Sequence, residues 1–510
     1  MLTGDHSQEQ DLQTMSYITL RLSSILRNCN PRSVFTHAAQ THVQILIHGL
    51  THNITLQTDL LLAYSKGLLL NARQVFDRMP ERNMHSWNIM ISAYVQNYMY
   101  HDALSVFDQF LNARMKPDHY SFPPLLKACA GVGDVSLGVM LHCMVVKLGF
   151  ESHVVVGSSV LDFYSKCGDL NDAKMVFERL SWKDTVAWNS MISGLAKAGL
   201  QLEALDCFRN MIGNKHKIDS MTIPTLLIAC GKLGDVTKGK EIHGQVVKNV
   251  LLYNDTAVSN SLIDMYSKCG CLCDAKKIFC RMKNLNLVTW TTMISCFGVH
   301  GKGDEALNLF EKMKELGFKP NSVTLTAILA SCSHSGLINQ GKKIFNSIRS
   351  SYGFEPSVEH YACLVDLLSR FGCFKDALVL ISSMKMVPSA SVWGALLAGS
   401  LVHRNIETGE MAARHLFELE PENASNYIAL CSIYDSRGMW KDASRVRLKI
   451  RRLRLDKTPG SSWISVGGEI HTFYQGNLSF SVDQKTRETL EWIIRTPVLV
   501  HSEKQSFLPA

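Results

Sequence analysis

Residues 185–219 read TVAWNSMISGLAKAGLQLEALDCFRNMIGNKHKID and contain two apolar stripes with a spacing near 3.6 residues. A glycine-containing turn, Lys197-Ala198-Gly199, separates the two stripes. Two amphipathic stripes joined by such a turn are typical of two helices that pack against each other. The segment therefore predicts a helix–turn–helix hairpin, with the small residue Ala204 in its second helix.

This pattern repeats along most of the chain. Five sets of marker residues recur in one register at steps of 100 to 102 residues. The sets are Trp87, Trp188 and Trp290; Phe107, Phe208 and Phe310; Cys29, Cys129, Cys230 and Cys332; His42, His142 and His243; and Tyr64, Tyr164 and Tyr266. Each long period contains three shorter units, whose second stripes carry Ala72, Ala103, Ala173, Ala204, Ala275, Ala306 and Ala377.

One such hairpin cannot cover its own apolar faces, whereas a stack of hairpins can. The shorter units are 35, 31 and 35 residues long, as in 119–153, 154–184 and 185–219. We therefore expect an all-α fold, a right-handed superhelical α-solenoid of helix–turn–helix repeats with a continuous groove.

Composition constrains the class of protein less than the repeats do. The chain has 510 residues and a net charge of +8, which suits a polyanionic partner and equally suits an ordinary basic surface. None of the fifteen cysteines forms a C-x-x-C pair, which favours free thiols in a reducing compartment over a disulfide framework. No apolar run approaches the roughly 20 residues that span a bilayer, so no membrane partner is expected.

The quoted markers resemble the pentatricopeptide repeat family of plants, in the subclass that mixes standard, long and short repeats. Leu125-Leu126-Lys127-Ala128-Cys129 is similar to its long repeats, and 262–270, LIDMYSKCG, to its short ones. The resemblance divides the chain into an N-terminal segment at 1–18, for which disorder is one option, and eleven repeats over 19–389. The repeats are 19–53, 54–83, 84–118, 119–153, 154–184, 185–219, 220–255, 256–286, 287–321, 322–357 and 358–389.

The C-terminal part resembles the E motifs that follow the repeats in this subclass. Two helical E motifs are expected over 390–457, an E extension over 458–495 and a tail over 496–510. His501-Ser502-Glu503 is similar to the start of the family's deaminase domain. No cysteine follows Cys431 to complete a zinc site, so the match is either accidental or a remnant, and no complete DYW deaminase domain is expected.

The resemblance implies that the fifth and the last residue of a repeat together select one RNA base. The resulting pairs are Thr58 with Asn83, Asn88 with Asp118, Ser158 with Asp184, Asn189 with Asp219, Asn260 with Asn286, and Thr291 with Asn321. Under the family's pairing rules, the order from residue 54 to residue 321 is A, U, unread, G, U, unread, pyrimidine, A. Pro123 and Pro224 occupy the fifth place of the unread repeats.

These side chains have a second interpretation. Asn, Asp, Ser and Thr favour helix N-caps and turns, which explains the last-position residues well, and capping and reading are compatible. The fifth-position residues fall inside helices, where a polar side chain avoids the burial penalty if it points into a solvent-filled groove. We therefore expect them to face such a groove.

Other groupings carry weaker signals. The cysteines Cys269, Cys271, Cys273 and Cys280 are dense, but their spacing fits no known zinc finger, so packing thiols are favoured over a metal site. The recurrent His42, His142 and His243 predict packing between hairpins. The basic run from Arg445 to Lys457 is either a solvated helix face or a contact for phosphates or an acidic partner.

The resemblance implies a site-recognition factor for organellar C-to-U RNA editing that is not itself an enzyme and needs no cofactor. Its implied partners are single-stranded organellar RNA, a DYW-type cytidine deaminase acting in trans and other editing factors. An RNA-binding factor for transcript stability, splicing or translation is one alternative, and a protein scaffold is another. The implied location is the mitochondrion, or alternatively the chloroplast, although the acidic N-terminus shows no clear transit peptide.

Overall fold

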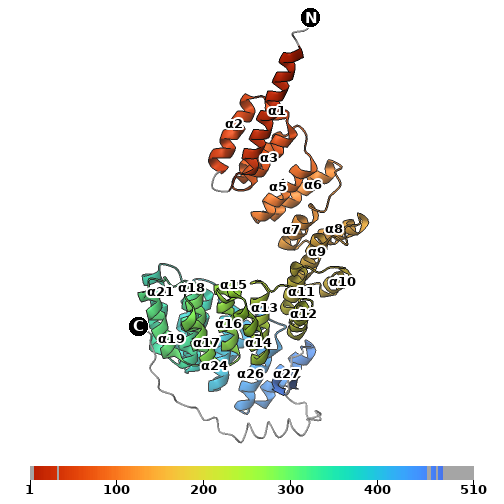
Figure 1. The fold of residues 1–510 in the computed structure, drawn as a ribbon. Helices are drawn as coiled ribbons and strands as arrows, with labels where there is room; N and C mark the ends of the chain where they lie inside the picture. The colour runs from red at the N-terminus through yellow and green to blue at the C-terminus, as the bar shows by residue number, and fades with distance from the viewer. Residues whose placement is uncertain (1–4, 31–33, 456–460, 467–468, 475–510) are drawn as a thin grey trace. The chain divides into compact units, whose positions relative to one another are not determined.

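The computed structural model describes residues 5–30, 34–455, 461–466 and 469–474 (Figure 1). The chain divides into two compact units, Met1–Cys269 and Gly270–Ala510. Each unit consists of stacked helical hairpins, so the predicted α-solenoid of helix–turn–helix repeats is confirmed.

The first unit contains the helices up to α16. They are α1 (Asp5–Arg27), α2 (Ala39–Ile47), α3 (Ile54–Ser65), α4 (Leu69–Arg78), α5 (Met84–Gln96), α6 (Tyr100–Asn112), α7 (Phe122–Val132), α8 (Val135–Lys147), α9 (Val154–Cys167), α10 (Leu170–Arg179), α11 (Thr185–Lys197), α12 (Gln201–Gly213), α13 (Thr222–Leu233), α14 (Val236–Lys248), α15 (Val250–Tyr253) and α16 (Thr256–Lys268). A π-helical segment, Val34–Ala38, precedes α2, and a 3-10 turn, Leu50–His52, follows it.

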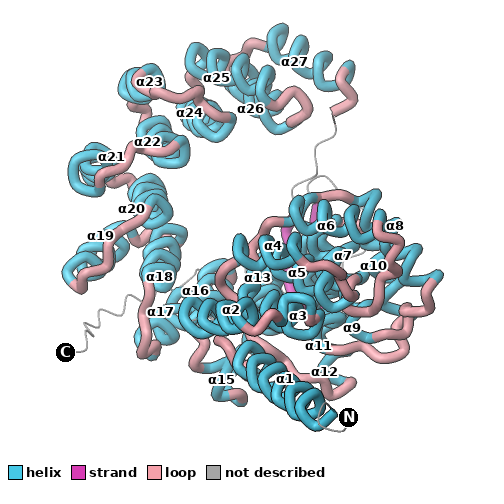
Figure 2. Tube along the Cα trace, turned by 90° about the horizontal axis from the view of Figure 1, so that it is seen from above, coloured by secondary structure: helices cyan, strands magenta, loops and turns pink. Residues whose placement is uncertain are grey.

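The second unit continues the same alternation and adds a pair of strands. Its elements are α17 (Leu272–Arg281), α18 (Leu287–Val299), α19 (Gly303–Glu315), α20 (Ser322–Ser335), α21 (Ile338–Tyr352), α22 (Val358–Arg370), α23 (Phe374–Ser382), α24 (Ala390–His403), α25 (Ile406–Leu419), α26 (Ala424–Ser436), α27 (Trp440–Arg452), β1 (Ser461–Val466) and β2 (Glu469–Tyr474). Figure 2 shows α18 to α27 following one another as successive pairs.

The structure differs in two features from a purely helical array of repeats that starts at residue 19. The strands β1 and β2 pair antiparallel, with Ser461 opposite Tyr474 and Val466 opposite Glu469, inside the expected E extension. Residues 5–18, for which disorder was one option, belong to α1. The tail at 496–510, with His501-Ser502-Glu503, lies outside the described residues.

The helices form two layers within each unit. The first helices of successive repeats contact one another, α3 with α5, α5 with α7, and so on to α16, and again from α18 through α26. Where both helices of a hairpin lie in the same unit, the second helix contacts the first and, in most repeats, also contacts the first helix of the next repeat. Residues at equivalent places in the first helices therefore recur side by side along each unit.

A small residue lies where each second helix crosses the first helix of the next repeat. The alanines predicted at this place, such as Ala103, Ala173 and Ala306, are fully buried. Gly138 and Gly341 occupy the same place in long repeats. A Cβ added at Gly138 would lie 2.0 Å from the Phe163 ring, and one at Gly341 would lie 2.4 Å from Leu367. A larger residue there would push neighbouring hairpins apart.

The three recurrent histidines make the predicted contact between hairpins. Nδ1 of His42 lies 3.1 Å from the Tyr64 hydroxyl, and Nδ1 of His142 lies 2.9 Å from that of Tyr164. The His243–Tyr266 distance is 3.0 Å. Each bond joins a second helix to the first helix of the next repeat. Within the described residues, no helix is long and apolar enough to cross a bilayer.

The close approach at Gly138 predicts that alanine substitutions at two glycines have different effects on the free energy of unfolding. We expect Gly138→Ala to lower the free energy of unfolding by about 1–3 kcal/mol, because the buried Phe163 ring must move. Gly244→Ala is the matched control, since nothing lies within 4 Å of its added Cβ, and it should stabilise its helix by about 0.5–1 kcal/mol. Denaturant titration measures both changes. Equal effects would contradict the close-packing account.

The half-buried histidines predict a pH dependence of stability. Burial is the main cause that lowers the pKa of His142 below its usual 6.5, so the folded side chain stays neutral where an unfolded one takes a proton. The free energy of unfolding should therefore fall as the pH drops from about 7.5 to 5.5. His142→Gln, which cannot titrate, should reduce this slope in melts recorded across that range. An unchanged slope would exclude His142 as a contributor.

Candidate nucleic-acid interface

The fifth-position residues lie in the second turn of the first helices. Thr58 lies in α3, Asn88 in α5, Ser158 in α9, Asn189 in α11 and Asn260 in α16, all in the first unit. Thr291 lies in α18, in the second unit. Because the first helices pack against one another, these polar groups recur from repeat to repeat along each unit.

In repeat 84–118 the two predicted residues are hydrogen-bonded directly. The Nδ2 of Asn88 donates to Oδ1 of Asp118 over 3.0 Å. Ser121, in the next repeat, donates its hydroxyl to Oδ1 of Asn88 over 2.8 Å and also lies 2.9 Å from Oδ1 of Asp118. Burial raises the pKa of Asp118, but hydrogen bonds from Ser121 and Asn88 outweigh it and lower the pKa overall. The carboxylate is therefore ionised at neutral pH.

Repeat 185–219 has the same arrangement. The Nδ2 of Asn189 donates to Oδ2 of Asp219 over 2.9 Å. The hydroxyl of Thr222 bonds both Oδ1 of Asn189 and, at 2.8 Å, Oδ1 of Asp219. Two repeats about 100 residues apart thus each place an amide, a carboxylate and a hydroxyl in the same arrangement.

Two short repeats that lie wholly in the first unit, 54–83 and 154–184, have a hydroxyl in the fifth place. Ser158 donates its hydroxyl to Oδ1 of Asp184 over 2.8 Å. In repeat 54–83 the amide Nδ2 of Asn83 donates to the Thr58 hydroxyl over 3.3 Å. In four repeats of the first unit, the fifth and the last residue are therefore in direct contact.

Repeat 287–321 connects its pair through a third residue. The hydroxyls of Thr291 and Thr324 lie 2.8 Å apart, and the Thr324 hydroxyl also lies 2.9 Å from Oδ1 of Asn321. Thr291 donates its own proton to the backbone carbonyl of Leu287 over 2.8 Å. Asn260 and Asn286 belong to different units. Among the described residues, Oδ1 of the buried Asn260 accepts no hydrogen bond.

The fifth-position side chains are more enclosed than a water-filled groove implies. Ser158 is 2% exposed, Asn88 7% and Asn260 9%, while Asn189 and Thr291 are half-buried. The expectation that these groups avoid burial is therefore wrong. At Asn88, Ser158 and Asn189, hydrogen bonds to the last residue of the repeat offset the burial penalty.

The last-position residues also cap helices, as the alternative interpretation predicts. The side chain of Asn83 accepts from the backbone N–H of Ser86 at the start of α5, and Asp184 accepts from that of Ala187 at the start of α11. Asn286 and Asn321 cap α18 and α20 in the same way. Asn83 and Asp184 therefore each hold the start of the next helix and contact the fifth residue of their own repeat.

Sequence analysis missed the hydroxyl that links these residues. Ser121, Thr222 and Thr324 each follow the last residue of a repeat by three positions, and each is 1% exposed or less. The spacing of an Asp or Asn followed three places later by Ser or Thr is visible in the sequence. At Asn321 and Thr324 it is the N-cap to N3 spacing, at which a side chain reaches back to the cap.

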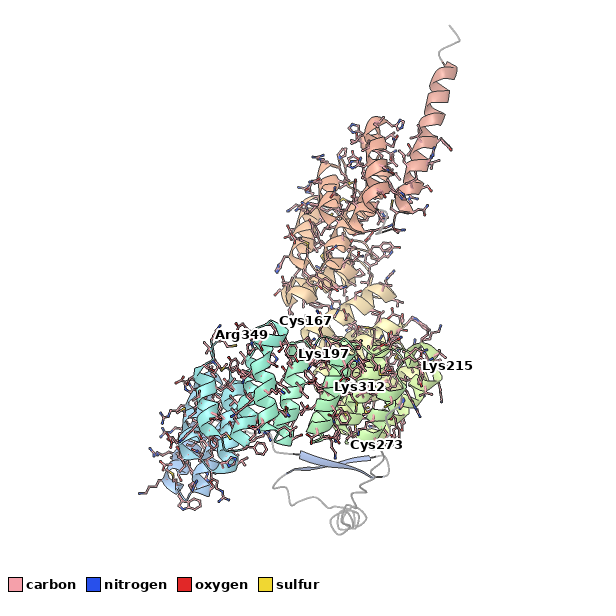
Figure 3. All side chains as sticks on the ribbon, turned by 90° about the vertical axis from the view of Figure 1, so that its left-hand side faces the viewer. Cys167, Lys197, Lys215, Cys273, Lys312 and Arg349 are labelled. Carbon is pink, nitrogen blue, oxygen red and sulfur yellow. The ribbon has the colours of Figure 1, made fainter. Side chains whose placement is uncertain are left out.

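The other candidate groups lack the geometry of a site. Within the part of the chain that the structure describes, no three His, Cys, Asp or Glu side chains are placed to hold a metal ion. Cys167 and Cys273, which Figure 3 labels, are half-buried and exposed. Burial raises the pKa of the Cys230 thiol to about 12, which keeps it protonated. In α27, Arg447 pairs with Asp435, while Arg451 and Arg452 are exposed.

The double role of Asp184 leads to a stability prediction. Asp184→Ala removes the cap of α11 and the bond from Ser158, so the free energy of unfolding should fall by about 1–2 kcal/mol. Asp184→Asn keeps an acceptor oxygen and should cost much less. Denaturant melts together with hydrogen exchange at the first turn of α11 measure the difference. Equal losses of unfolding free energy in the two variants would mean that the side-chain oxygen at position 184 does not stabilise the start of α11 or the contact with Ser158.

Comparison with family models finds three that match this chain. The E motif matches residues 403–465, a PPR repeat family model matches 82–131 and 285–334, and a PPR repeat model matches 158–184, 186–216 and 258–287. The model matches thus fall on both units.

Curated relatives match over most of the chain. A pentatricopeptide repeat-containing protein of Arabidopsis thaliana, named as mitochondrial, is 39% identical over 88% of this chain and 70% of its own length. Another from the same plant, named as chloroplastic, is 35% identical over 97% of this chain and 60% of its own length. The chain thus spans 60% to 70% of the length of these two relatives.

Solved structures share the fold. The crystal structure of the pentatricopeptide repeat protein PPR10 in complex with an 18-nt psaJ RNA element matches with a TM-score of 0.65 at 17% identity, over 82% of this chain and 64% of that one. A structure of PPR10 from maize matches with a TM-score of 0.55 at 18% identity, over 83% and 63%. From its repeats, its E motif and its relatives, the chain belongs to the plant pentatricopeptide repeat family, in the subclass with a C-terminal E motif.

Proposed function

We propose that this protein binds single-stranded RNA in a sequence-specific manner and acts as a site-recognition factor for C-to-U editing in an organelle. The observation that carries the proposal is the contact between the fifth and the last residue in repeats 54–83, 84–118, 154–184 and 185–219. RNA bound to PPR10, a protein of the same fold, supports RNA as the ligand.

The chemistry of the pairs suits base edges. An Asn amide offers a donor and an acceptor, as a pyrimidine edge requires, while a Ser or Thr hydroxyl is smaller and leaves space for a purine. By the family's pairing rules, the two Asn–Asp repeats, 84–118 and 185–219, are assigned to uracil. The Thr58–Asn83 pair is assigned to adenine and the Ser158–Asp184 pair to guanine.

The editing role rests on the E motif at 403–465 and on relatives named as mitochondrial and chloroplastic. In this proposal the repeats hold RNA upstream of the target cytidine, and the E region docks a DYW-type deaminase supplied by another protein. The exposed Arg451 and Arg452 of α27 lie inside the E motif and offer positive charge to such a partner or to RNA phosphates.

Exchanging one pair for another tests the reading directly. The double variant Asn88→Thr with Asp118→Asn reproduces the Thr58–Asn83 pair in repeat 84–118. We expect its preference at that base to change from uracil to adenine by roughly tenfold, because one good base contact is worth about 1–3 kcal/mol. Gel shifts measure this with RNAs that carry the order A, U, any, G, U, any, pyrimidine, A, synthesised in both polarities.

The same experiment separates the other functions. Equal binding of this RNA and a scrambled RNA would contradict sequence reading, and no RNA binding at all would favour a protein scaffold. In plants that lack the gene, loss of conversion at particular cytidines is the expected result. Altered transcript ends with intact conversion would instead indicate an RNA-binding factor without an editing role.

A further inference from the structure

We propose that a third residue completes the base-reading group: the hydroxyl three positions after the last residue of a repeat, which positions the fifth-position side chain. It is Ser121 for Asn88, Thr222 for Asn189 and Thr324 for Thr291. This inference rests on the proposed RNA reading and adds a residue that lies in the following repeat.

The amide of Asn88 is held at both ends. The Asp118 carboxylate only accepts hydrogen bonds, so Nδ2 must face it, at 3.0 Å. Oδ1 then faces the hydroxyl of Ser121, 2.8 Å away, whose one proton is shared between Oδ1 of Asn88 and Oδ1 of Asp118. The amide therefore cannot turn over or tilt without losing a bond, and each of its two ends has a fixed place.

The order of donor and acceptor on this amide decides between pyrimidines. After the bonds to Asp118 and Ser121, the amide keeps one N–H and one oxygen lone pair for a base. Uracil presents a donor at N3 beside a carbonyl acceptor, whereas cytosine presents an acceptor at N3 beside an amino donor. An amide held with its N–H toward O4 and its oxygen toward N3–H matches uracil and opposes cytosine, whose N4 amino group and N3 present the reverse order, while a loosely held amide tolerates both.

Other repeats of the chain show that the hydroxyl link is not a general consequence of capping. Ser86 occupies the same place after Asn83, but its hydroxyl bonds the backbone carbonyl of Asn83 and not the fifth residue. Ala187 occupies it after Asp184, where Ser158 has no amide to orient. In the first unit, the link occurs at the two repeats that present an Asn amide beside an Asp carboxylate.

Ser121 also stabilises the turn before α7, since its Oγ accepts from the backbone N–H of Asp118 over 3.2 Å. A purely structural role would weaken every RNA equally when this hydroxyl is lost. A positioning role instead changes the ratio of affinities for uracil and cytosine. The ratio is therefore the quantity that separates the two.

The test measures the affinities of the full chain for two RNAs that differ only by uracil or cytosine at the base assigned to Asn88. Ser121→Ala should reduce the uracil preference several-fold, and Ser121→Thr, which keeps a hydroxyl, should retain it. Ser86→Ala is the matched control: it removes a buried capping hydroxyl and should leave the ratio unchanged. Thr222→Val, nearly identical in shape, repeats the test at Asn189 and covers the case in which Ser121→Ala fails to fold.

Asn88→Ala distinguishes failure of this inference from failure of the proposed function. If Asn88→Ala leaves the ratio unchanged, the residue does not read the base and the proposed function is wrong there. If Asn88→Ala removes the preference while Ser121→Ala and Thr222→Val leave it intact, reading is correct and the positioning role is wrong. A uniform loss of affinity in the two hydroxyl variants also overturns the positioning role.

Discussion

The close approach of neighbouring hairpins is the constraint on which the rest of the structure depends. A second helix can cross the next first helix only where its side chain is alanine or glycine, as at Ala173 and Gly138. This contact fixes the distance from one first helix to the next. The fifth-position residues lie on these first helices, so packing in the core also sets the spacing between them.

In several repeats, one small hydrogen-bond network holds the start of the next repeat and pairs the buried fifth residue with the last one. Asp184 holds the start of α11 and accepts from Ser158, and Asp118 does the same for the turn before α7 and for Asn88. A buried polar group is stable only when its partners are present. These networks therefore keep the polar groups of the first helices ordered before any ligand arrives.

The repeat pattern of the sequence predicted the hairpins, the alanine positions and the packing of His142 because these depend on spacing alone. The enclosure of Asn88 and the role of Ser121 were not predicted, because they depend on which hydrogen-bond partner a side chain meets in the next repeat. The strand pair β1–β2 also escaped prediction. The resemblance alone placed these two short segments in the E extension. It made no use of the alternation of apolar and polar residues that indicates a strand.

Under the proposed RNA reading, a last residue that both caps a helix and helps to select a base limits how such a protein can be retargeted. Asn83, Asp184 and Asn321 all start helices, and few side chains do this well. A substitution that selects a new base at this position must introduce another side chain that caps helices well. Otherwise it destabilises the start of the next helix. New specificities are then reached mainly by recombining existing pairs of fifth and last residues. The thermal stability of a variant therefore depends on the RNA sequence that it was selected to bind.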